Sequence, residues 1–496
     1  MLSSIPLLCY MGAGNWKAFI LGSGTYGFGL LDISLDWNYI SFFSPMYTPL
    51  WANANRFAGA IFSCWILYPI MYFSNIANTQ NYAAMSSGTW DKTGAKYNIS
   101  LVLNSDFTLN KTAMNLYSMP KWSASYAMHF FWGFASSTAV LIYCLLFHAN
   151  SSWKKILKSW RNERTDYDDP YLKLTAHLPR VPHWWYASLL GVCVVFAALQ
   201  LYMSQMQLPF WGLLLITALS ALFTLPSGLL FGFTNVYVGM EYLSELLAGF
   251  LFPGKPIAVL TSMVYGRQVL AQCLNMISDI KFGFYMKIPE HELFYAQVYG
   301  TLLGPFVNWA CMRLIIDLQG PKLTGEVASN TWNALKTKNF YSLSVIWGVI
   351  GPSIFFSQMS DYGWIYYGFV VGIASVVLVW LVQRRMGYGD VESYVNPVLM
   401  FNGASIFPIY TTTNLMTSVI TAFLIMGYTY RVHTGWFHKY NYLIGAGLDC
   451  GSQLVQVGIV FVSSFPAAAI PSWWGNNAVA VDRCFPPSDL PKNALN

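Results

Sequence analysis

The sequence predicts an all-α membrane protein: a polytopic helical bundle in which some helices are broken or re-entrant. Of its 496 residues, 55% are apolar and only 10% are charged, and the mean hydropathy is +0.43. A soluble protein of this length carries more charge. Long stretches also lack Asp, Glu, Lys and Arg, and a helix of about 20 such residues crosses the hydrocarbon. These stretches are 122–152, 184–240, 293–312, 339–360, 362–383 and 393–430.

The first predicted span, 56–75, is followed by a polar segment at 77–121. This segment contains two Asn-x-Ser/Thr sequons, at Asn98 and Asn110. Sequons are glycosylated in extracytoplasmic loops. We therefore expect the segment to be extracytoplasmic, with these two asparagines as candidate glycosylation sites.

The next predicted span, 122–148, leads into a basic loop at 153–183. Seven Lys and Arg residues in this region place the loop in the cytoplasm by the positive-inside rule. The net charge of +6 therefore sits in loops, where it favours contact with the lipid bilayer over nucleic acid. Two further spans, 184–204 and 208–225, form a predicted hairpin.

Beyond Pro226, Gly and Pro repeatedly interrupt the apolar sequence, as in "NPVLMFNGASIFPIY" at 396–410. The basic clusters 384–385 and 431–439 flank this stretch, and one regular helix between them would put them on opposite sides of the membrane. A broken or re-entrant crossing removes the conflict. Irregular backbone at membrane depth is tolerated where it is buried or lines a cavity, so it indicates a transport site. We predict roughly ten to twelve crossings or re-entrant pieces, ending in an exposed tail at 466–496.

Ionisable residues in apolar sequence are the main functional candidates, because a charge at the centre of a membrane helix is costly. Glu241 and Glu245 are four residues apart and so share a helical face. For Glu245 and Asp279, which apolar residues flank, we favour a role in a proton relay or a substrate site. Glu241, or the Lys255 and Lys287 groups, can instead lie at helix ends and reach water, and for Lys255 we favour that interpretation.

Three other polar residues have structural interpretations. His129 and His148 lie 19 residues apart on one charge-free stretch and are expected to be hydrogen-bonded packing residues. Asp449 is a lone acid in an apolar helix near Gln453 and Gln456. Function and a structural hydrogen bond are equally good interpretations of Asp449.

Signatures of enzymes are missing from the sequence. It contains no phosphate-binding loop, no His-Glu-x-x-His pair and no Gly-x-Ser-x-Gly elbow. We therefore expect no enzyme activity, no cofactor and no metal site. Without an ATP site, any concentrative transport must draw on an ion gradient.

The stretch from Gly232 to Gly304 resembles the central signature of the oligopeptide transporter family in its fungal form. It contains Thr-Asn-x-x-x-Gly, "FPGKP" and "SDIKFGFYMKIP", and the blocks "DWNYISFF", "DKTGAKYN", "SVIWGVIGPSIFF" and "KYNYLIGAGLDCG" follow the family order elsewhere. The matching positions of the central signature are Thr234, Asn235, Gly239, Glu245, Pro253, Gly254, Pro256, Gln272, Asp279, Lys281, Gly283, Tyr285, Met286, Lys287, Ile288 and Pro289.

This resemblance implies a proton-coupled importer of small peptides, glutathione-like peptides among them, that works by alternating access in the plasma membrane. Its partners would be the peptide, protons and the bilayer. Glu245 and Asp279 would be proton-coupling acids, and Arg267 or Lys281 would hold a peptide carboxylate. The whole implied path is Asn235, Glu241, Glu245, Arg267, Gln272, Asp279, Lys281, Tyr285 and Lys287. Metal-chelate or siderophore transport, and a non-transporting remnant, stay open as alternatives.

Three departures from the family pattern stand out. Glu290-His291 replaces Pro-Arg, which suggests an altered pH dependence. Glu241 stands where Asn is usual, and Met263 where Lys is common, with Arg267 one turn later. Family members also carry further spans before the Asp-Trp-Asn block, so 1–490 resembles the C-terminal two thirds of the family's membrane domain. If those helices form part of the path, we expect this chain alone not to transport.

Overall fold

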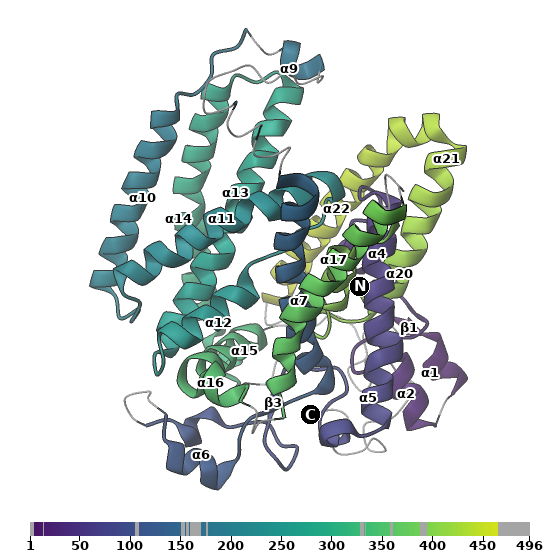
Figure 1. Cartoon of the computed structure of the whole chain (residues 1–496), viewed down its shortest axis with the longest axis vertical. Helices are drawn as coiled ribbons and strands as arrows, with labels where there is room; N and C mark the ends of the chain where they lie inside the picture. The colour runs from purple at the N-terminus through teal and green to yellow at the C-terminus, as the bar shows by residue number, and fades with distance from the viewer. Residues whose placement is uncertain are drawn as a thin grey trace. The chain divides into compact units, whose positions relative to one another are not determined.

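The computed structural model is mostly helical, as Figure 1 shows. It describes residues 4–464, apart from 13, 105–108, 150–153, 155–157, 159–169, 175–176, 328–331, 333, 358–360 and 387–393. Nine helical segments in this part are long and apolar enough to cross a membrane. They are α4–η2–α5 (Leu50–Ile61, Phe62–Leu67, Tyr68–Phe73), α7–η5 (Ala124–Tyr143, Cys144–His148), α10 (His183–Met203), α11 (Phe210–Thr234), α13 (Pro256–Met286), α14 (Glu290–Thr324), η7–α17 (Gly363–Tyr366, Tyr367–Met386), α20–η8–α21 (Thr413–Ala422, Phe423–Thr429, Tyr430–Val432) and α22 (Thr434–Ser464).

Two membrane-depth helices are too short to cross, which confirms the prediction of broken helices. α12 (Glu241–Leu251) has 11 residues and α19 (Pro397–Ala404) has 8. At 1.5 Å per residue they are about 16 and 12 Å long, against about 30 Å of hydrocarbon. Shorter elements complete the described chain: α1 (Leu7–Met11), α2 (Trp16–Gly22), α3 (Trp37–Ile40), η1 (Ser41–Phe43), η3 (Ile76–Asn81), η4 (Ile99–Val102), α6 (Lys111–Tyr117), α9 (Pro170–Leu174), α15 (Leu335–Val345), η6 (Ile346–Ile350) and α16 (Pro352–Phe355).

The chain divides into two compact units. Unit 1 comprises Met1–Phe147, Pro226–Val238 and Val349–Asn496, and unit 2 comprises His148–Leu225 and Gly239–Gly348. Each unit therefore contains one of the half-length helices, α19 in unit 1 and α12 in unit 2.

Close backbone contacts between α7 and α17 build one side of unit 1. A Cβ at Gly368 would lie 2.4 Å from the Phe131 carbonyl oxygen, and one at Gly372 would lie 2.3 Å from that of Ala135. From the first of these contacts to the second, the residue number rises by four on both helices, so α7 and α17 run parallel. Only glycine permits this approach, so these two residues set the helix spacing.

α19 runs parallel to α4 and antiparallel to α7. Asn55 accepts a hydrogen bond from the Asn396 amide (2.8 Å), and the Tyr68 hydroxyl donates to the Phe407 carbonyl (3.4 Å), so the two helices advance together. Beside α7 the order is reversed, because His129 contacts the Ser405 carbonyl while Trp132 stacks on Phe401.

The chain then returns along α20 to the end of α4 at which it entered. Leu50 and Ala54 of α4 line one groove with Met426 and Tyr430. α17 is parallel to α7 and therefore antiparallel to α4, so its C-terminal cluster 384–385 lies at the end where α4 begins. The cluster 431–439 lies at the same end, because α20 returns to it. This re-entrant arrangement confirms the broken crossing at 396–410. The assignment of that end to the cytoplasm stays a prediction.

Two boundaries differ from the sequence-based expectation. The first span begins at Leu50 rather than at residue 56, because Pro49 can precede a helix and Leu50 to Ala54 continue the helical run. α11 continues nine residues beyond residue 225, through Pro226 to Thr234. A membrane helix tolerates proline where neighbouring groups satisfy the freed backbone.

The polar segment 77–121 has a small core of its own, formed by Tyr82, Ala83 and Trp90. Strand β3 (Thr89–Trp90) pairs with β4 (Lys121–Trp122). A second two-stranded pair, β1 (Ile5–Pro6) with β2 (Asp32–Ile33), lies near the start of the chain. Burial raises the pKa of Asp91 in the turn after β3, but hydrogen bonds from Thr93, Ala95 and Gly94 outweigh it and lower the pKa overall. The side chains of Asn98 and Asn110 cap η4 and α6, and their glycosylation stays a prediction.

Lys121, beside Trp122 at the end of this segment, forms an ion pair with Asp361. The predicted tail 466–496 and most of the basic loop 153–183 lie outside the described residues.

Candidate functional site

The two candidate glutamates lie on α12, a helix whose limits follow from its sequence. It begins directly after Gly239-Met240 and ends at Leu251, before Phe252-Pro253-Gly254. Gly254 has φ +78°, which glycine adopts without strain. Pro256 then starts α13 at a position where a missing N–H costs nothing.

Glu245 is buried to 5% exposure, and one of its carboxylate oxygens, Oε2, has no hydrogen-bond partner. Oε2 of Glu241, one turn earlier on the same face, is also buried without a partner. A Cβ at Gly239 would lie 1.8 Å from that Glu241 oxygen, so Gly239 makes room for the carboxylate. Buried, incompletely bonded carboxylates are costly and are typical of functional sites.

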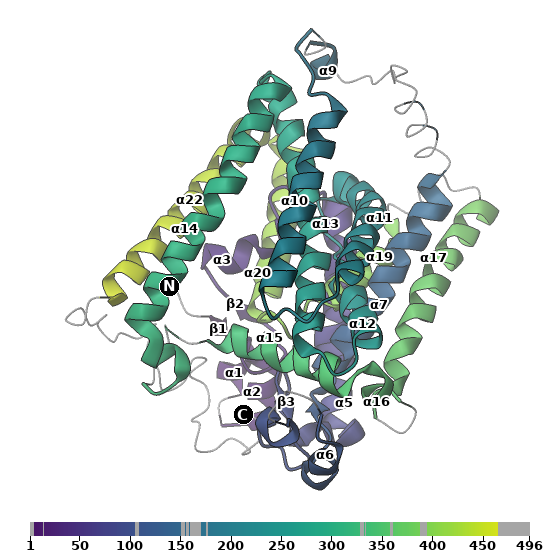
Figure 2. The same ribbon diagram turned by 90° about the vertical axis from the view of Figure 1, so that its left-hand side faces the viewer.

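Arg267 on α13 supplies the opposite charge. The charges of both Glu241 and Arg267 act on the Glu245 carboxyl. α12 lies against α13 in Figures 1 and 2, and a Cβ at Gly266 would lie 2.7 Å from the Ser244 Cβ. Glycine at 266 therefore lets α12 approach α13 beside the two acids. The structure thus brings together Glu241, Glu245 and Arg267, three of the predicted residues.

A second group of candidates, Asp279, Lys281, Tyr285 and Lys287, lies at the C-terminal end of α13. Asp279 is twelve residues beyond Arg267, about 18 Å along the helix. It is exposed and accepts a hydrogen bond from Gln297 Nε2 (2.6 Å). Lys281 Nζ lies 4.8 Å from the Tyr285 ring centroid, and Lys287 ends the helix with φ +57°.

Gln272 and Asn235 belong to neither group. Gln272 is exposed on α13, between the two groups. Asn235 follows α11 in unit 1, with φ +56°, and its amide donates to Thr48 Oγ1 at 3.2 Å.

Glu290 and His291 bind backbone of the preceding loop. Glu290 Oε2 accepts a hydrogen bond from the Val181 amide (3.0 Å), and His291 Nε2 lies 2.9 Å from the Arg180 carbonyl oxygen. The His291 ring also stacks on Trp185, with centroids 5.2 Å apart. These contacts give the departure from the family pattern a structural role, and its effect on pH dependence stays a prediction.

Two polar residues left open above have structural partners. His129 is buried at 6% exposure against the Ser405 carbonyl, which confirms a hydrogen-bonded packing role. Asp449 accepts a hydrogen bond from Trp37 Nε1 (2.6 Å), and Gln456 on the same helix donates to Asn38 (2.9 Å). α22 is thereby attached to α3, which favours the structural interpretation of Asp449.

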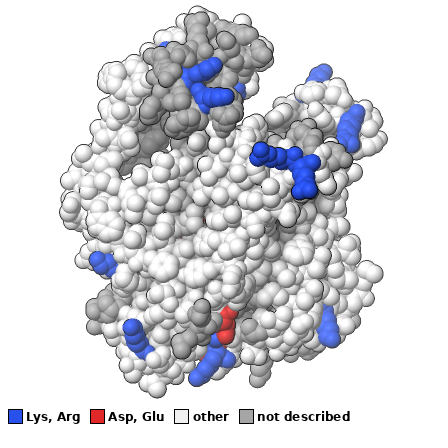
Figure 3. Space-filling view, viewed as in Figure 1, with Lys and Arg blue, Asp and Glu red and all other residues white. Residues whose placement is uncertain are grey.

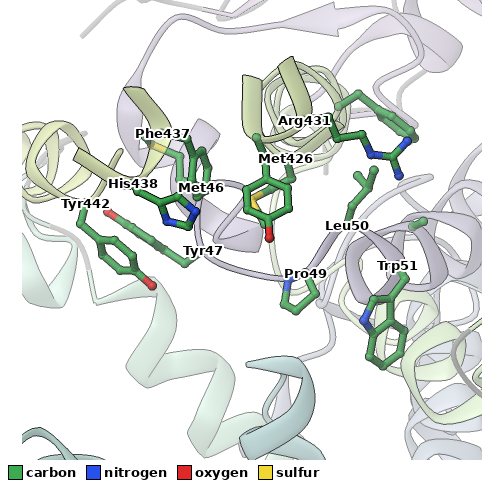
Figure 4. Close-up of a pocket in the computed structure, with 13 residues that line it drawn as sticks. Met46, Tyr47, Pro49, Leu50, Trp51, Met426, Arg431, Phe437, His438 and Tyr442 are labelled. Carbon is green, nitrogen blue, oxygen red and sulfur yellow. The ribbon is translucent and has the colours of Figure 1, made fainter. Parts of the chain in front are cut away.

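An apolar groove of about 650 Å³ lies in unit 1, outside the predicted site (Figure 4). Its floor includes Met46, Leu50 and Met426. In Figure 4, His438 lies with Tyr47 and Tyr442 on one side of the groove, and Arg431 lies on the other. Burial raises the pKa of Tyr47, and the charges of Asp449 and Tyr442 raise it further. A groove with an apolar centre and polar ends suits an amphipathic molecule.

Arg56 was missed as a site residue, because the sequence put it at the edge of a span. With α4 starting at Leu50, it lies inside one. The signal that could have found it is the apolar run from Pro49 to Ala54, which extends the helix towards the N-terminus. Elsewhere the face drawn in Figure 3 is largely uncharged, with Lys and Arg at separate positions.

Comparisons with known proteins agree with the quoted signature. The OPT oligopeptide transporter protein family matches residues 1–463. Oligopeptide transporter phomP2 of Diaporthe leptostromiformis is 52% identical over 99% of this chain and 65% of its own length. Oligopeptide transporter 7 of Arabidopsis thaliana is 30% identical (98% and 63%), and glutathione transporter 1 of Schizosaccharomyces pombe is 31% identical (96% and 55%). The chain thus spans about two thirds or less of the length of these relatives.

Proposed function

We propose, from the premise that this chain belongs to the OPT oligopeptide transporter family, that it carries small peptides across a membrane by alternating access. The half-length helices α12 and α19 support this, because broken helices form the substrate and ion sites of many transporters. Of the three relatives reported above, two carry "oligopeptide transporter" in their names and one carries "glutathione transporter". We accordingly propose short peptides, glutathione-like ones included, as substrates, and the plasma membrane as the location.

Coupling to protons is proposed at Glu245, and this rests on one observation: its carboxylate is buried with Oε2 unbonded beside Glu241. In this proposal Glu245 carries the coupled proton and releases it when the site opens to water, as carboxylic acids do in the proton relays of transporters. Arg267 then stabilises the carboxylate that remains. Asp279 is proposed as a second coupling acid at the far end of α13.

Neutral hydrogen bonds to the peptide are proposed for Asn235, Gln272 and Tyr285. A cation at Arg267 or Lys281 is the sequence-based proposal for the peptide carboxylate. Lys287 ends α13, where its ammonium can reach water or substrate.

The test is proton-driven uptake of a labelled tetrapeptide by proteoliposomes containing the whole chain. We expect uptake to require an inward proton gradient and to fall at least tenfold in Glu245→Gln, with a smaller loss in Asp279→Asn. Asp317→Asn is the control, because Asp317 is an exposed acid on α14.

Undiminished uptake at acidic pH in Glu245→Gln would remove this residue from the coupling role. Inhibition by metal chelates and not by unlabelled peptides would favour chelate transport. A chain that inserts and folds without any uptake would favour the non-transporting interpretation.

A further inference from the structure

Arg56 is a cation inside a membrane-length helix, and no carboxylate in the described part of the chain forms an ion pair with it. It lies six residues into α4, about 9 Å from the start of the helix, and is half-buried. Among the described residues the one ion pair joins Lys121 to Asp361, so no described carboxylate balances Arg56. Ionisable residues at such a position are costly and are usually retained for function.

The guanidinium group of Arg56 uses little of its hydrogen-bonding capacity. Nε donates to Asn402 Oδ1 on α19 (3.2 Å), and the group lies 4.7 Å from the Phe43 ring centroid. Arginine has five N–H donors. Nη1 and Nη2 donate to no atom in the described part of the chain. Two parallel N–H groups match the two oxygens of a carboxylate.

Asn53 supplies a second, independent observation. It lies three residues before Arg56, so both side chains share one face of α4. Asn53 is fully buried at 0% exposure, and neither its Nδ2 nor its Oδ1 has a hydrogen-bond partner. A buried amide left unbonded costs free energy unless a further group completes it.

The half-length helix α19 fixes the position of this cation. Gly403 lies where a Cβ would be 2.0 Å from the Arg56 carbonyl oxygen, so α19 and α4 are in backbone contact beside the guanidinium. Asn402 donates its own amide to the Tyr237 carbonyl (3.1 Å), which orients its oxygen for Arg56. The neighbouring helix therefore holds Nε and leaves the other nitrogens available.

We propose that Arg56, with Asn53 beside it and Asn402 orienting it, binds the C-terminal carboxylate of the transported peptide. This inference rests on the proposed function. Arg267 and Lys281 are less suited to the task, because the charge of Arg267 acts on Glu245 and Lys281 lies over the Tyr285 ring. A single carboxylate at Arg56 balances its charge and completes its hydrogen bonds.

The test compares two peptides on the purified whole chain in lipid nanodiscs. One is a fluorescent tetrapeptide with a free C-terminal carboxylate, and the other is the same peptide with a C-terminal amide. We expect the acid to bind at least about tenfold more tightly, the discrimination typical of one charge-assisted pair. In Arg56→Met this ratio should fall to about one.

The matched control is Arg384→Met. Arg384 also lies over an aromatic ring, 5.1 Å from the Trp380 centroid, but it is exposed at the end of α17. Its removal should leave the acid-to-amide ratio unchanged. A ratio that persists in Arg56→Met overturns the inference while leaving peptide transport intact.

Asn53→Asp decides the matter if Arg56→Met fails to fold. This substitution breaks no existing hydrogen bond and places a carboxylate one turn from Arg56, where it competes with the ligand. The acid-to-amide ratio should fall several-fold, and an unchanged ratio overturns the inference. If the unmodified chain binds neither peptide, the proposed function fails and this inference with it.

Discussion

The half-length helices α12 and α19 end inside the membrane for opposite physical reasons. α19 contains no ionisable side chain, and neutral amides and close glycine contacts hold it in place. α12 contains two glutamates whose buried oxygens lack partners. The comparison teaches that a broken helix can bury charge of its own, as α12 does, or can support a charged side chain of a neighbouring helix, as α19 does for Arg56.

Side-chain hydrogen bonds stabilise the start of α19, although Nδ2 of Asn396 is buried without a partner among the described residues. The Asn396 side chain caps the helix by accepting from the amides of Val398 and Leu399 (3.1 and 3.3 Å). Asn55 joins α4 to the start of α19 with two hydrogen bonds, one to the Tyr394 carbonyl and one from the Asn396 amide, and it donates a third to the Trp51 carbonyl within α4. The Val398 and Leu399 amides lie in the first turn of α19, where backbone N–H groups have no partner within the helix.

The α12 arrangement instead leaves buried carboxylate oxygens without partners among the described residues. Met240 at its start caps no amide with its side chain, and Glu241 occupies the first turn. A buried charge without a partner destabilises a fold. When a buried ion pair loses one member, the cost is roughly 3–5 kcal/mol. Selection retains such a cost for function, which is why the proposed coupling site is placed here.

The largest expected effect is that of Gly59→Ala at the crossing of α4 and α19. The new Cβ would lie 1.8 Å from the Met400 carbonyl oxygen. Because the obstacle is backbone, we expect destabilisation of about 3 kcal/mol or more. Thermal unfolding in detergent measures it. Gly300→Ala is the control, since nothing lies within 4 Å of its added Cβ, and equal melting temperatures for both variants would contradict a tight crossing.

A smaller loss is expected from Asn55→Ala, which removes two hydrogen bonds to the start of α19 and one within α4. Leaving the Asn396 amide and the Tyr394 carbonyl unbonded should cost about 2 kcal/mol. The same unfolding measurement applies, with Asn308→Ala on an exposed face of α14 as the control. A change below about 0.5 kcal/mol, the usual size for a surface substitution, would contradict a structural role for this amide.

At α12 we expect a substitution to leave the folding stability unchanged or to raise it, whereas the substitutions at Gly59 and Asn55 should lower it. Glu245→Gln keeps the shape of the side chain and removes its charge, so stability should stay equal or rise by up to about 1 kcal/mol. Unfolding of this variant is compared with that of Asp317→Asn, which should change little. Clear destabilisation would mean that the Glu245 charge holds the fold together through Arg267, and the contrast between the two helices would then disappear.

Much of the fold could be predicted, because most charge-free stretches of membrane length contain spans. The stretch 339–360 does not: its described part holds the end of α15, η6 and α16, none of which is among the nine spanning segments. The re-entrant path at 396–410 could also be predicted, since the two basic clusters require it. The start of α4 and the continuation of α11 through Pro226 could not, because a single-sequence pattern does not show which neighbours satisfy the backbone at a proline.

The candidate site also has one part that the sequence could predict and one part that it could not. Glu241 and Glu245 could be paired from their spacing alone, and Arg267 could be suspected beside them. The partial burial of Arg56 and the lack of hydrogen bonds to Asn53 depend on how helices pack against one another. Arg56, for example, contacts Asn402, which is more than 300 positions away in the sequence. Spacing along one helix carries no information about such contacts.

The paired strands β3 and β4 have a practical consequence for experiments on living cells. Their pairing closes the part of the polar segment from Thr89 to Trp122 into a loop, and Lys121 at its end forms an ion pair with Asp361. Leu116, on the helix between them, is 79% exposed. An epitope inserted beside Leu116 should therefore be displayed without disturbing the helices, and antibody labelling of intact cells would then report which side of the membrane this segment faces.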